Sequence, residues 1–243
     1  VEVQGRLSGK IAIVTGAARR NGMGRAIAGE LAAEGATIVV ADYKRQEEGE
    51  ALVAEIVARG GKAASIDGNV ADVTRCAEIV GFAVEHFGGL DILVNNAGHG
   101  VRQSLAEISE TDYDFQLDLH LKGPFFLIQA AVPHMRQRAG GRIVNISSEL
   151  AYIGCRDLSH YSAAKAGLVG LTKALALELA PDITVNAVCP GPTATDKFKS
   201  GPEYKEEIRE GLPLKRWGTP RDVARSVLFL VSSDGDAFTG QTL

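Results

Sequence analysis

Residues 11–27 read IAIVTGAARRNGMGRAI, and this stretch decides the fold class. Its first five residues are apolar or β-branched on both faces, which is typical of a strand buried in a parallel sheet. Glycines follow at positions 16, 22 and 24, and a helical pattern begins at position 25. A glycine-rich turn between a strand and a helix lets a pyrophosphate approach backbone N–H groups at the helix N-terminus. The stretch therefore predicts a dinucleotide-binding unit.

Short apolar runs alternate with longer amphipathic segments along the chain. Parallel strands are joined by helical crossovers, so this rhythm predicts one doubly wound α/β domain over residues 1–243, with helices on both faces of a parallel sheet. The expected strands are 11–15, 37–41, 63–66, 92–95, 142–147 and 184–188. The expected helices are 24–34, 46–59, 73–86, 104–137, 160–180 and 220–232. A long connection breaks the rhythm, and residues 192–215 within it are interpreted as a substrate lid.

The composition excludes several classes of function. The net charge is −4 and no basic run occurs, so bulk charge attracts neither nucleic acid nor an anionic membrane. No apolar stretch approaches the roughly 18 residues of a membrane helix. The three cysteines are too widely spaced for a disulfide framework or a zinc site, and Cys155 is expected to be a small buried residue. His99 and His160 are expected at the surface or at the rim of the site, and neither is expected to bind a metal. The protein is expected to be cytoplasmic.

Asp42 closes the second expected strand, about twenty residues after Gly22. An acid at this distance accepts hydrogen bonds from the adenosine ribose. Its carboxylate would repel the extra phosphate of NADP, whereas Arg19 and Arg20 would attract it. An unpaired carboxylate against a phosphate is costly, so we expect NAD, with NADP the less favoured cofactor. The alternative is that Asp42 only begins a turn or caps the next helix.

Tyr161 and Lys165 lie four residues apart in an expected helix, which places both on one face. Hydride transfer to a carbonyl needs a proton donor, and alcohol oxidation needs a base. A nearby ammonium favours the phenolate, so Lys165 is expected to lower the pKa of Tyr161 from its ordinary value of about 10. Ser148 follows an expected strand, and its hydroxyl could hydrogen-bond the reacting oxygen. The alternatives are a surface Tyr–Lys pair and a serine that merely caps the strand.

These motifs together resemble the classical short-chain dehydrogenase/reductase family. Four blocks occur in that family's order: Thr15-Gly16 with Gly22-Met23-Gly24, Asn95-Asn96-Ala97-Gly98, Ser148…Tyr161-x-x-x-Lys165, and Pro190-Gly191-x-x-x-Thr195. The resemblance covers essentially the whole chain. It implies a single Rossmann-type domain that assembles as a homotetramer or homodimer and acts on a small-molecule alcohol or carbonyl.

The resemblance also implies roles for individual residues. Tyr161 transfers the proton, Lys165 holds the nicotinamide ribose, and Ser148 orients the substrate, while Thr193 and Thr195 contact the carboxamide. The expected cofactor-binding set is Gly16, Arg19, Asn21, Gly22, Met23, Gly24, Asp42, Asn69, Val70, Asn96, Ala97, Gly98, Tyr161, Lys165, Pro190, Gly191, Thr193 and Thr195.

Three positions depart from the family pattern. The loop between Gly16 and Gly22 encloses five residues, where the family normally has three. Asn69, before Val70, stands where the family has an acid near adenine, and an amide can still hydrogen-bond adenine. His120 stands where the family has an active-site Asn that acts largely through its backbone carbonyl. We expect His120 to be a tolerated replacement within the catalytic set; the alternative is that its imidazole joins the proton path.

The leading hypothesis is an NAD-dependent oxidoreductase that interconverts a secondary alcohol and a ketone. A 3-oxoacyl-thioester reductase or 3-hydroxyacyl-thioester dehydrogenase is the alternative within the enzyme class. A non-catalytic NAD-binding regulator is a third hypothesis, which the intact Ser148, Tyr161 and Lys165 oppose. The expected substrate walls are 99–102, 149–153, His160 and the lid, and their mixed polarity favours a small or medium polar alcohol.

Overall fold

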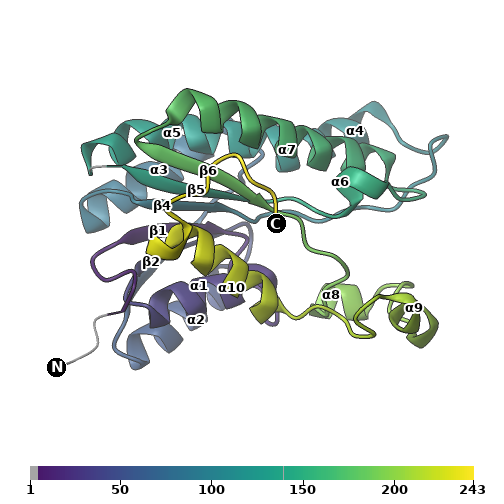
Figure 1. Ribbon diagram of the computed structural model, residues 1–243, viewed down its shortest axis with the longest axis horizontal. Coiled ribbons are helices and arrows are strands. Elements are labelled where there is room, and N and C mark those ends of the chain that lie inside the picture. The colour runs from purple at the N-terminus through teal and green to yellow at the C-terminus, as the bar shows by residue number, and fades with distance from the viewer. Residues whose placement is uncertain (1–4, 139) are drawn as a thin grey trace.

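The computed structural model describes residues 5–138 and 140–243, and a six-stranded parallel sheet forms its centre (Figure 1). The strands are β1 (Ile11–Thr15), β2 (Thr37–Asp42), β3 (Lys62–Asp67), β4 (Ile92–Asn95), β5 (Gly141–Ile146) and β6 (Ile183–Val188). Their order is β3-β2-β1-β4-β5-β6, so the direction of winding reverses between β1 and β4. The carboxyl ends of these two strands open the crevice in which such sheets bind ligands.

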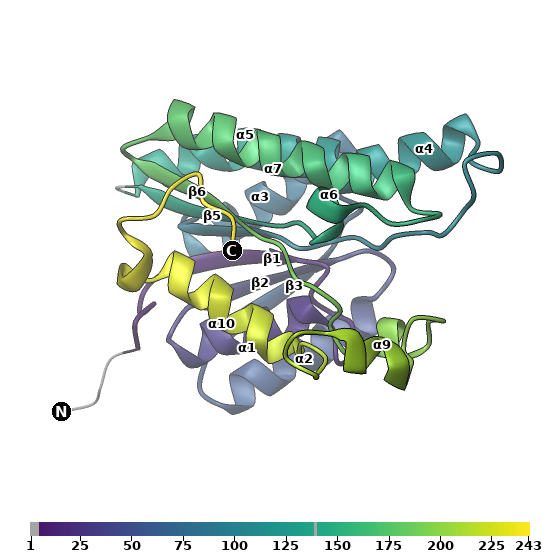
Figure 2. The ribbon, with the colours of Figure 1, turned by 45° about the vertical axis from the view of Figure 1, so that its right-hand side comes forward.

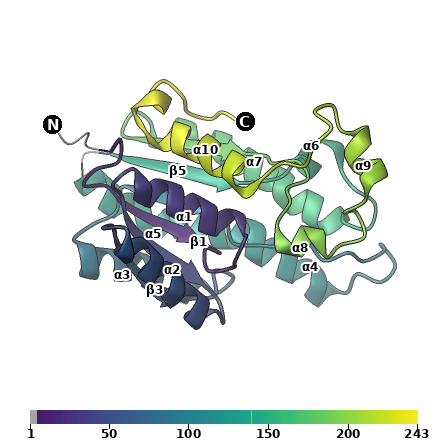
Figure 3. The ribbon, with the colours of Figure 1, turned by 90° about the horizontal axis from the view of Figure 1, so that it is seen from below.

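Helices cover both faces of the sheet, which confirms the doubly wound α/β fold (Figures 1 and 3). One layer holds α1 (Met23–Ala33), α2 (Gln46–Ala58) and α10 (Pro220–Val231), and the other holds α3 (Val73–Phe87), α5 (Gly123–Gln137) and α7 (Ser159–Leu179). Successive residues of β1 serve different cores: Val14 packs with the first layer and Ile13 with the second. Because both faces are buried, the strands read as continuous apolar runs.

The predicted helix over 104–137 is wrong in its extent. The structure has α4 (Glu110–Leu117), a π-helical turn (Asp118–Lys122) and then α5. Ser109 begins α4 through a capping box with Asp112, which explains the later start. The π turn inserts one extra residue, and such turns are frequent at functional sites. None of the helices in the described ranges is long and apolar enough to cross a membrane.

The segment expected to be a lid contains two short helices, α8 (Asp196–Lys199) and α9 (Glu206–Gly211). Figure 2 shows α9 at one end of the molecule, beyond the helix layers. Phe198 and Tyr204 of this segment pack with Trp217, which follows it, with ring centroids 5.2–5.8 Å apart. The three rings form a small aromatic cluster, and closure of the segment over a substrate stays a prediction.

Asp91 links two strands and a helix end at the edge of the sheet opposite the crevice. It is 3% exposed and precedes β4. Its Oδ2 accepts the Ile11 N–H at 2.8 Å and Nε of Arg138 at 3.0 Å. One carboxylate therefore ties β1, β4 and the chain after α5 together.

We expect Asp91→Ala to lower the free energy of unfolding by about 2–3 kcal/mol, because it leaves a buried N–H and a guanidinium without their acceptor. Denaturant unfolding measures this loss. Asp236→Ala is the control: its carboxylate pairs with Arg142 on the surface, so its loss is expected to stay within about 0.5 kcal/mol. Equal effects of the two substitutions would contradict the prediction.

Candidate functional site

The glycine loop lies at the carboxyl end of β1 and leads into α1. Gly16 has φ +64°, and a Cβ there would lie 2.7 Å from Cα of Ala97. A Cβ on Gly24 would lie 2.3 Å from the carbonyl oxygen of Gly16. The N-cap residue Gly22 makes no side-chain hydrogen bond, so the start of α1 is left uncapped. Glycine backbone and an uncapped helix start together form a cradle suited to a phosphate.

Asn96 joins the loops that follow β1 and β4. Its Nδ2 donates to the carbonyl oxygens of Thr15 at 2.8 Å and Gly16 at 3.2 Å. In return, Oγ1 of Thr15 accepts the N–H groups of Asn96 and Ala97, both at 3.0 Å. Oδ1 of Asn96 is buried and has no partner among the described residues. It therefore leaves a hydrogen-bond acceptor at the wall of the crevice.

A cavity of about 780 Å³ runs over this loop along the carboxyl edge of the sheet. Every expected cofactor-binding residue lines it except Asn21 and Lys165. Asn21 lies on the outside of the loop, with φ 47°, and its Nδ2 donates to Asp196 at 3.0 Å. Its bond to Asp196 holds the Asn21 side chain away from the cavity.

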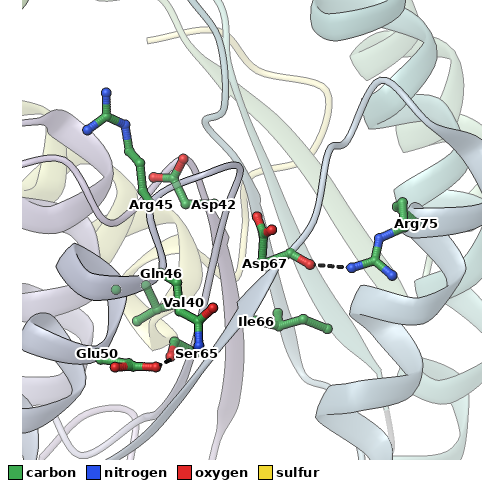
Figure 4. Close-up of a pocket in the computed structure, with 10 residues that line it drawn as sticks. Val40, Asp42, Arg45, Gln46, Glu50, Ser65, Ile66, Asp67 and Arg75 are labelled. Carbon is green, nitrogen blue, oxygen red and sulfur yellow. Dashed lines mark hydrogen bonds between the residues drawn. The ribbon is translucent and has the colours of Figure 1, made fainter.

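The adenosine end of the crevice carries two carboxylates. A second cavity of about 320 Å³ shares Asp42 and Arg45 with the first (Figure 4). Asp42 accepts the N–H groups of Ala18 and Tyr43, both at 2.8 Å. Asp67 stands beside Asp42 in the register of β2 and β3. The expected ribose site thus carries two carboxylates, and Arg45 and Arg75 are the cations that line the small cavity.

Asn69 and Val70 follow β3 and line the large cavity. Oδ1 of Asn69 accepts the N–H of Ala71 at 3.1 Å, so the side chain is fixed within its own loop. With Oδ1 used in this way, only the Nδ2 N–H groups of Asn69 are left to hydrogen-bond adenine. That role stays a prediction.

Ser148 and Tyr161 lie together at the other end of the cavity. Ser148 is the second residue after β5, and Tyr161 lies in the first turn of α7. Both side chains line the cavity, and Oγ of Ser148 accepts the N–H of Leu150 at 3.1 Å. Burial raises the pKa of Tyr161, although the Ser148 hydroxyl acts in the opposite direction. The phenol is therefore held in its protonated form.

Lys165 is buried behind Tyr161. Its Nζ donates to the carbonyl oxygen of Ile146 at 2.7 Å and lies 5.8 Å from the centroid of the Tyr161 ring. Burial lowers the pKa of Lys165 to about 7. The expectation that Lys165 lowers the pKa of Tyr161 is wrong for this structure, because burial disfavours the charged forms of both groups.

His120 lies in the π-helical turn, Asp118–Lys122. Its Nε2 donates to the carbonyl oxygen of His99 at 3.1 Å, and its ring stands edge-on to Tyr161 with centroids 5.0 Å apart. A Cβ on Gly98 would lie 2.1 Å from Cε1 of the imidazole, so the ring fills the space that this glycine leaves. Burial holds the pKa of His120 well below its ordinary value. The imidazole is thus neutral and positioned beside the reacting end.

The loop after β6 closes this end of the cavity. Oγ1 of Thr193 donates to the carbonyl oxygen of Gly191 at 2.9 Å, and Oγ1 of Thr195 accepts the N–H of Phe198 at 3.2 Å as the N-cap of α8. Both hydroxyls stabilise the loop itself. Their expected contact with a carboxamide stays a prediction.

The end of the large cavity that contains Ser148 and Tyr161, here called the substrate half, has apolar walls that sequence patterns did not predict. Phe115, Leu119 and Leu158 line it, yet each comes from a helix or loop that only tertiary packing brings there. Cys155 also lines the cavity and is partly exposed, so its expected burial is wrong. His160 is 2% exposed and does not line the cavity, so its expected place at the rim is wrong as well.

Arg102 bridges the mouth of the cavity. Its guanidinium pairs with Glu203 of the expected lid and donates to the carbonyl oxygen of Arg156 at 2.8 Å. The loop after β4 is thereby tied to both the 155–157 turn and the lid segment. The sequence predicted Arg102 only as part of the substrate wall. Its ion pair could not be predicted, because Glu203 lies far along the chain.

The residues present fit a nicotinamide dinucleotide. A glycine cradle and the uncapped start of α1 suit the pyrophosphate, and Asp42 offers acceptors for a ribose. At the far end, Tyr161 and Ser148 lie where a hydride acceptor would need a proton donor. The cavity that connects these groups is continuous.

Comparisons with known proteins agree with this arrangement. A family model described as enoyl-(acyl carrier protein) reductase matches residues 16–243. The 3-oxoacyl-[acyl-carrier-protein] reductase FabG of Staphylococcus aureus is 42% identical over 236 residues, which cover 96% of this chain and 95% of the relative. A short chain dehydrogenase from Burkholderia cenocepacia in complex with NADP has 40% identity and a TM-score of 0.92, over 98% and 96% of the two chains. A blue fluorescent protein from a metagenomic library in complex with NADPH has 38% identity and a TM-score of 0.90, over 98% and 96%.

We expect His120→Asn to keep kcat/KM within about tenfold, because a buried neutral imidazole positions neighbours and does not exchange a proton near neutral pH. The limbs of the pH–rate profile should stay in place. Steady-state kinetics across the pH range measures both. Loss of an ionisation near neutral pH, or a fall of about a hundredfold or more, would show that the imidazole carries the proton.

Proposed function

The chain belongs to the short-chain dehydrogenase/reductase family, and we propose that it reduces the ketone of a 3-oxoacyl thioester to the secondary alcohol. The family makes it an oxidoreductase that uses a nucleotide cofactor. Sequence patterns favoured a general alcohol/ketone pair and kept the thioester as the alternative. The observation that carries the proposal is the 42% identity, over nearly the full length of both chains, to a 3-oxoacyl-[acyl-carrier-protein] reductase.

The matching family description names an enoyl reductase, which would reduce a carbon–carbon double bond instead of a ketone. The site favours the ketone. Reduction of a ketone places negative charge on its oxygen, and a protonated phenol and a serine hydroxyl in one cavity wall suit that oxygen. Tyr161 and Ser148 supply this pair.

The reaction needs a hydride at the carbonyl carbon and a proton at the carbonyl oxygen. When bound, the reduced nicotinamide supplies the hydride. Ser148 orients the substrate oxygen by a hydrogen bond, and Tyr161 donates its proton to that oxygen. The raised pKa of Tyr161 keeps this proton in place until negative charge develops on the substrate. Lys165, fixed on the Ile146 carbonyl, holds a buried donor behind the phenol.

The apolar half of the cavity suits an acyl chain. Its walls include Phe115, Leu119, Leu150, Leu158, Phe198 and Ile208. Burial of a short alkyl chain against such walls stabilises binding by about 0.8 kcal/mol for each methylene. The polar part of the cavity wall, which Arg102 and Glu149 line, is left for the thioester end. An acyl carrier protein is the partner that the relative's name suggests, and a homotetramer or homodimer stays a prediction.

A substrate panel tests the proposal. With reduced cofactor, a 3-oxoacyl thioester is expected to be reduced with at least about tenfold higher kcat/KM than a simple ketone of similar length, followed by nicotinamide absorbance. An enoyl thioester should give no turnover. Preference for the simple ketone would contradict the proposal and support the hypothesis of a general alcohol/ketone oxidoreductase. No turnover of any carbonyl compound would support the hypothesis of a non-catalytic NAD-binding regulator.

We expect Tyr161→Phe to lower kcat by about 10²–10⁴-fold, because it removes only the proton-donating hydroxyl. Cofactor binding, followed by nicotinamide fluorescence, should stay close to that of the unmodified protein. Tyr113→Phe, on the exposed face of α4, is the matched control and should keep full activity. A Tyr161→Phe variant with more than about a tenth of kcat would remove Tyr161 from the mechanism.

We further propose NAD(H) as the preferred cofactor. NADP and NADPH occupy two solved relatives, and this favours the phosphorylated cofactor. The adenosine end of this chain argues against it, because Asp42 and Asp67 stand side by side in the register of β2 and β3 and line one small cavity. Two neighbouring carboxylates disfavour an additional phosphate, although Arg45 and Arg75 line the same cavity.

We expect the unmodified protein to prefer NAD(H) over NADP(H) in kcat/KM, and Asp42→Ala to narrow the gap, because the substitution removes the repulsion and leaves Arg19 and Arg45 in place. Parallel titrations of both cofactors with one substrate give the ratio. A preference for NADP(H) of about tenfold or more in the unmodified protein, roughly 1.4 kcal/mol, would show that the arginines outweigh the carboxylates.

A further inference from the structure

Glu149 lies directly after Ser148, at the seam between the loops that follow β5 and β6. Its N–H donates to the carbonyl oxygen of Pro190 at 3.1 Å. A Cβ on Gly191 would lie 3.1 Å from Oε2 and 3.8 Å from Oε1 of Glu149. The carboxylate therefore rests on the glycine of the β6 loop, on the cavity wall next to the reacting end.

Three carboxylates line this cavity, and two of them have partners. Asp42 accepts backbone N–H groups, and Glu203 pairs with Arg102. The Glu149 side chain has neither a hydrogen bond nor an ion pair within residues 5–138 and 140–243. Burial raises its pKa. A partly buried carboxylate without donors is costly for the folded protein, and such groups are concentrated at functional sites.

A carboxylate accepts hydrogen bonds and donates none, so its ligand must carry an N–H or O–H group. The ketone and the thioester carbonyl of the proposed substrate are acceptors only, and the acyl chain is apolar. Its first donor is the amide N–H of the thiol arm. A cationic donor fits less well, because Arg102 and Lys197 line the same half of the cavity.

We propose that Glu149 is a specificity-determining residue that accepts a hydrogen bond from the amide N–H in the thiol arm of the thioester substrate. This inference rests on the proposed function. It explains why an acid directly beside Ser148 is left without a partner from the chain. A bound substrate without the amide removes water from the Glu149 carboxylate and gives it no hydrogen bond in return. This cost is the reason why the protein is expected to prefer the amide-bearing substrate.

Two thioesters of 3-oxobutanoate test the proposal: one with N-acetylcysteamine, which carries the amide, and one with an alkanethiol of similar length, which does not. The unmodified protein is expected to prefer the amide-bearing thioester by about tenfold or more in kcat/KM. Glu149→Leu should reduce that preference to within about threefold. Glu149→Gln should keep part of it, since an amide oxygen still accepts a hydrogen bond.

Three measurements keep a structural effect separate from a specificity effect. The KM for the cofactor and the midpoint of thermal unfolding should stay close to those of the unmodified protein in both Glu149 variants. Asp236→Asn is the control, because its carboxylate pairs with Arg142 outside the cavity. It should change kcat/KM for the two thioesters by the same factor.

Equal use of the two thioesters by the unmodified protein, or a preference that survives in Glu149→Leu, would overturn the assignment and leave the proposed function intact. A raised cofactor KM with an unchanged preference would assign Glu149 to the nicotinamide instead. A preference for a hydroxyketone that Glu149→Leu removes would assign the donor to a substrate hydroxyl, which also overturns the proposal. Reduction of simple ketones but of neither thioester would refute the proposed function itself.

Discussion

The site depends on the hydrogen bonds that Asn96 and Thr15 exchange at the ends of β1 and β4. The sheet changes its direction of winding between these strands, so their loops diverge and leave a crevice. A crevice between diverging loops would be wide and mobile without a cross-link. The paired amide and hydroxyl hold the 96–98 segment on the glycine loop, and the absence of a Cβ at Gly16 permits that close approach. The phosphate cradle after β1 and the 96–98 segment after β4 are thereby joined along one edge of the sheet.

Burial is the second constraint, and it governs the reacting end. Tyr161, Lys165 and His120 are all placed where their charged forms are disfavoured, so the pKa of the first is raised and those of the other two are lowered. Tyr161 and His120 are neutral and form no ion pair with Lys165, whose pKa of about 7 leaves it partly protonated near neutral pH. The hydrogen-bonding capacity of these groups is kept for charge that develops on the substrate, which is the condition for electrostatic stabilisation of a transition state.

The strands and most helices could be predicted because each carries a local signal: apolar runs for buried strands, and a 3.6-residue period for the helices. The glycine loop, Asp42, Ser148 and Tyr161 could also be placed, since each follows a strand end or a helix pattern. Other features depend on contacts across the fold. The capping box at Ser109 makes the helix predicted over 104–137 begin later, and the Asn21 side chain bonds to Asp196 and does not line the cavity. The direction of the Tyr161 pKa shift was wrong because sequence spacing shows the neighbouring ammonium and does not show how deeply both groups are buried.

The distribution of donors and acceptors along the cavity follows from these constraints. Its middle section presents backbone N–H groups at the start of α1, which suit the negative pyrophosphate. Its two ends present carboxylates, Asp42 at the adenosine end and Glu149 at the substrate end. A carboxylate at either end repels an additional anion and binds a neutral donor such as a ribose hydroxyl or an amide N–H. The proposed cofactor preference and the proposed substrate preference therefore have one physical basis: each end presents a carboxylate, which disfavours an added anion and accepts a hydrogen bond from a neutral donor.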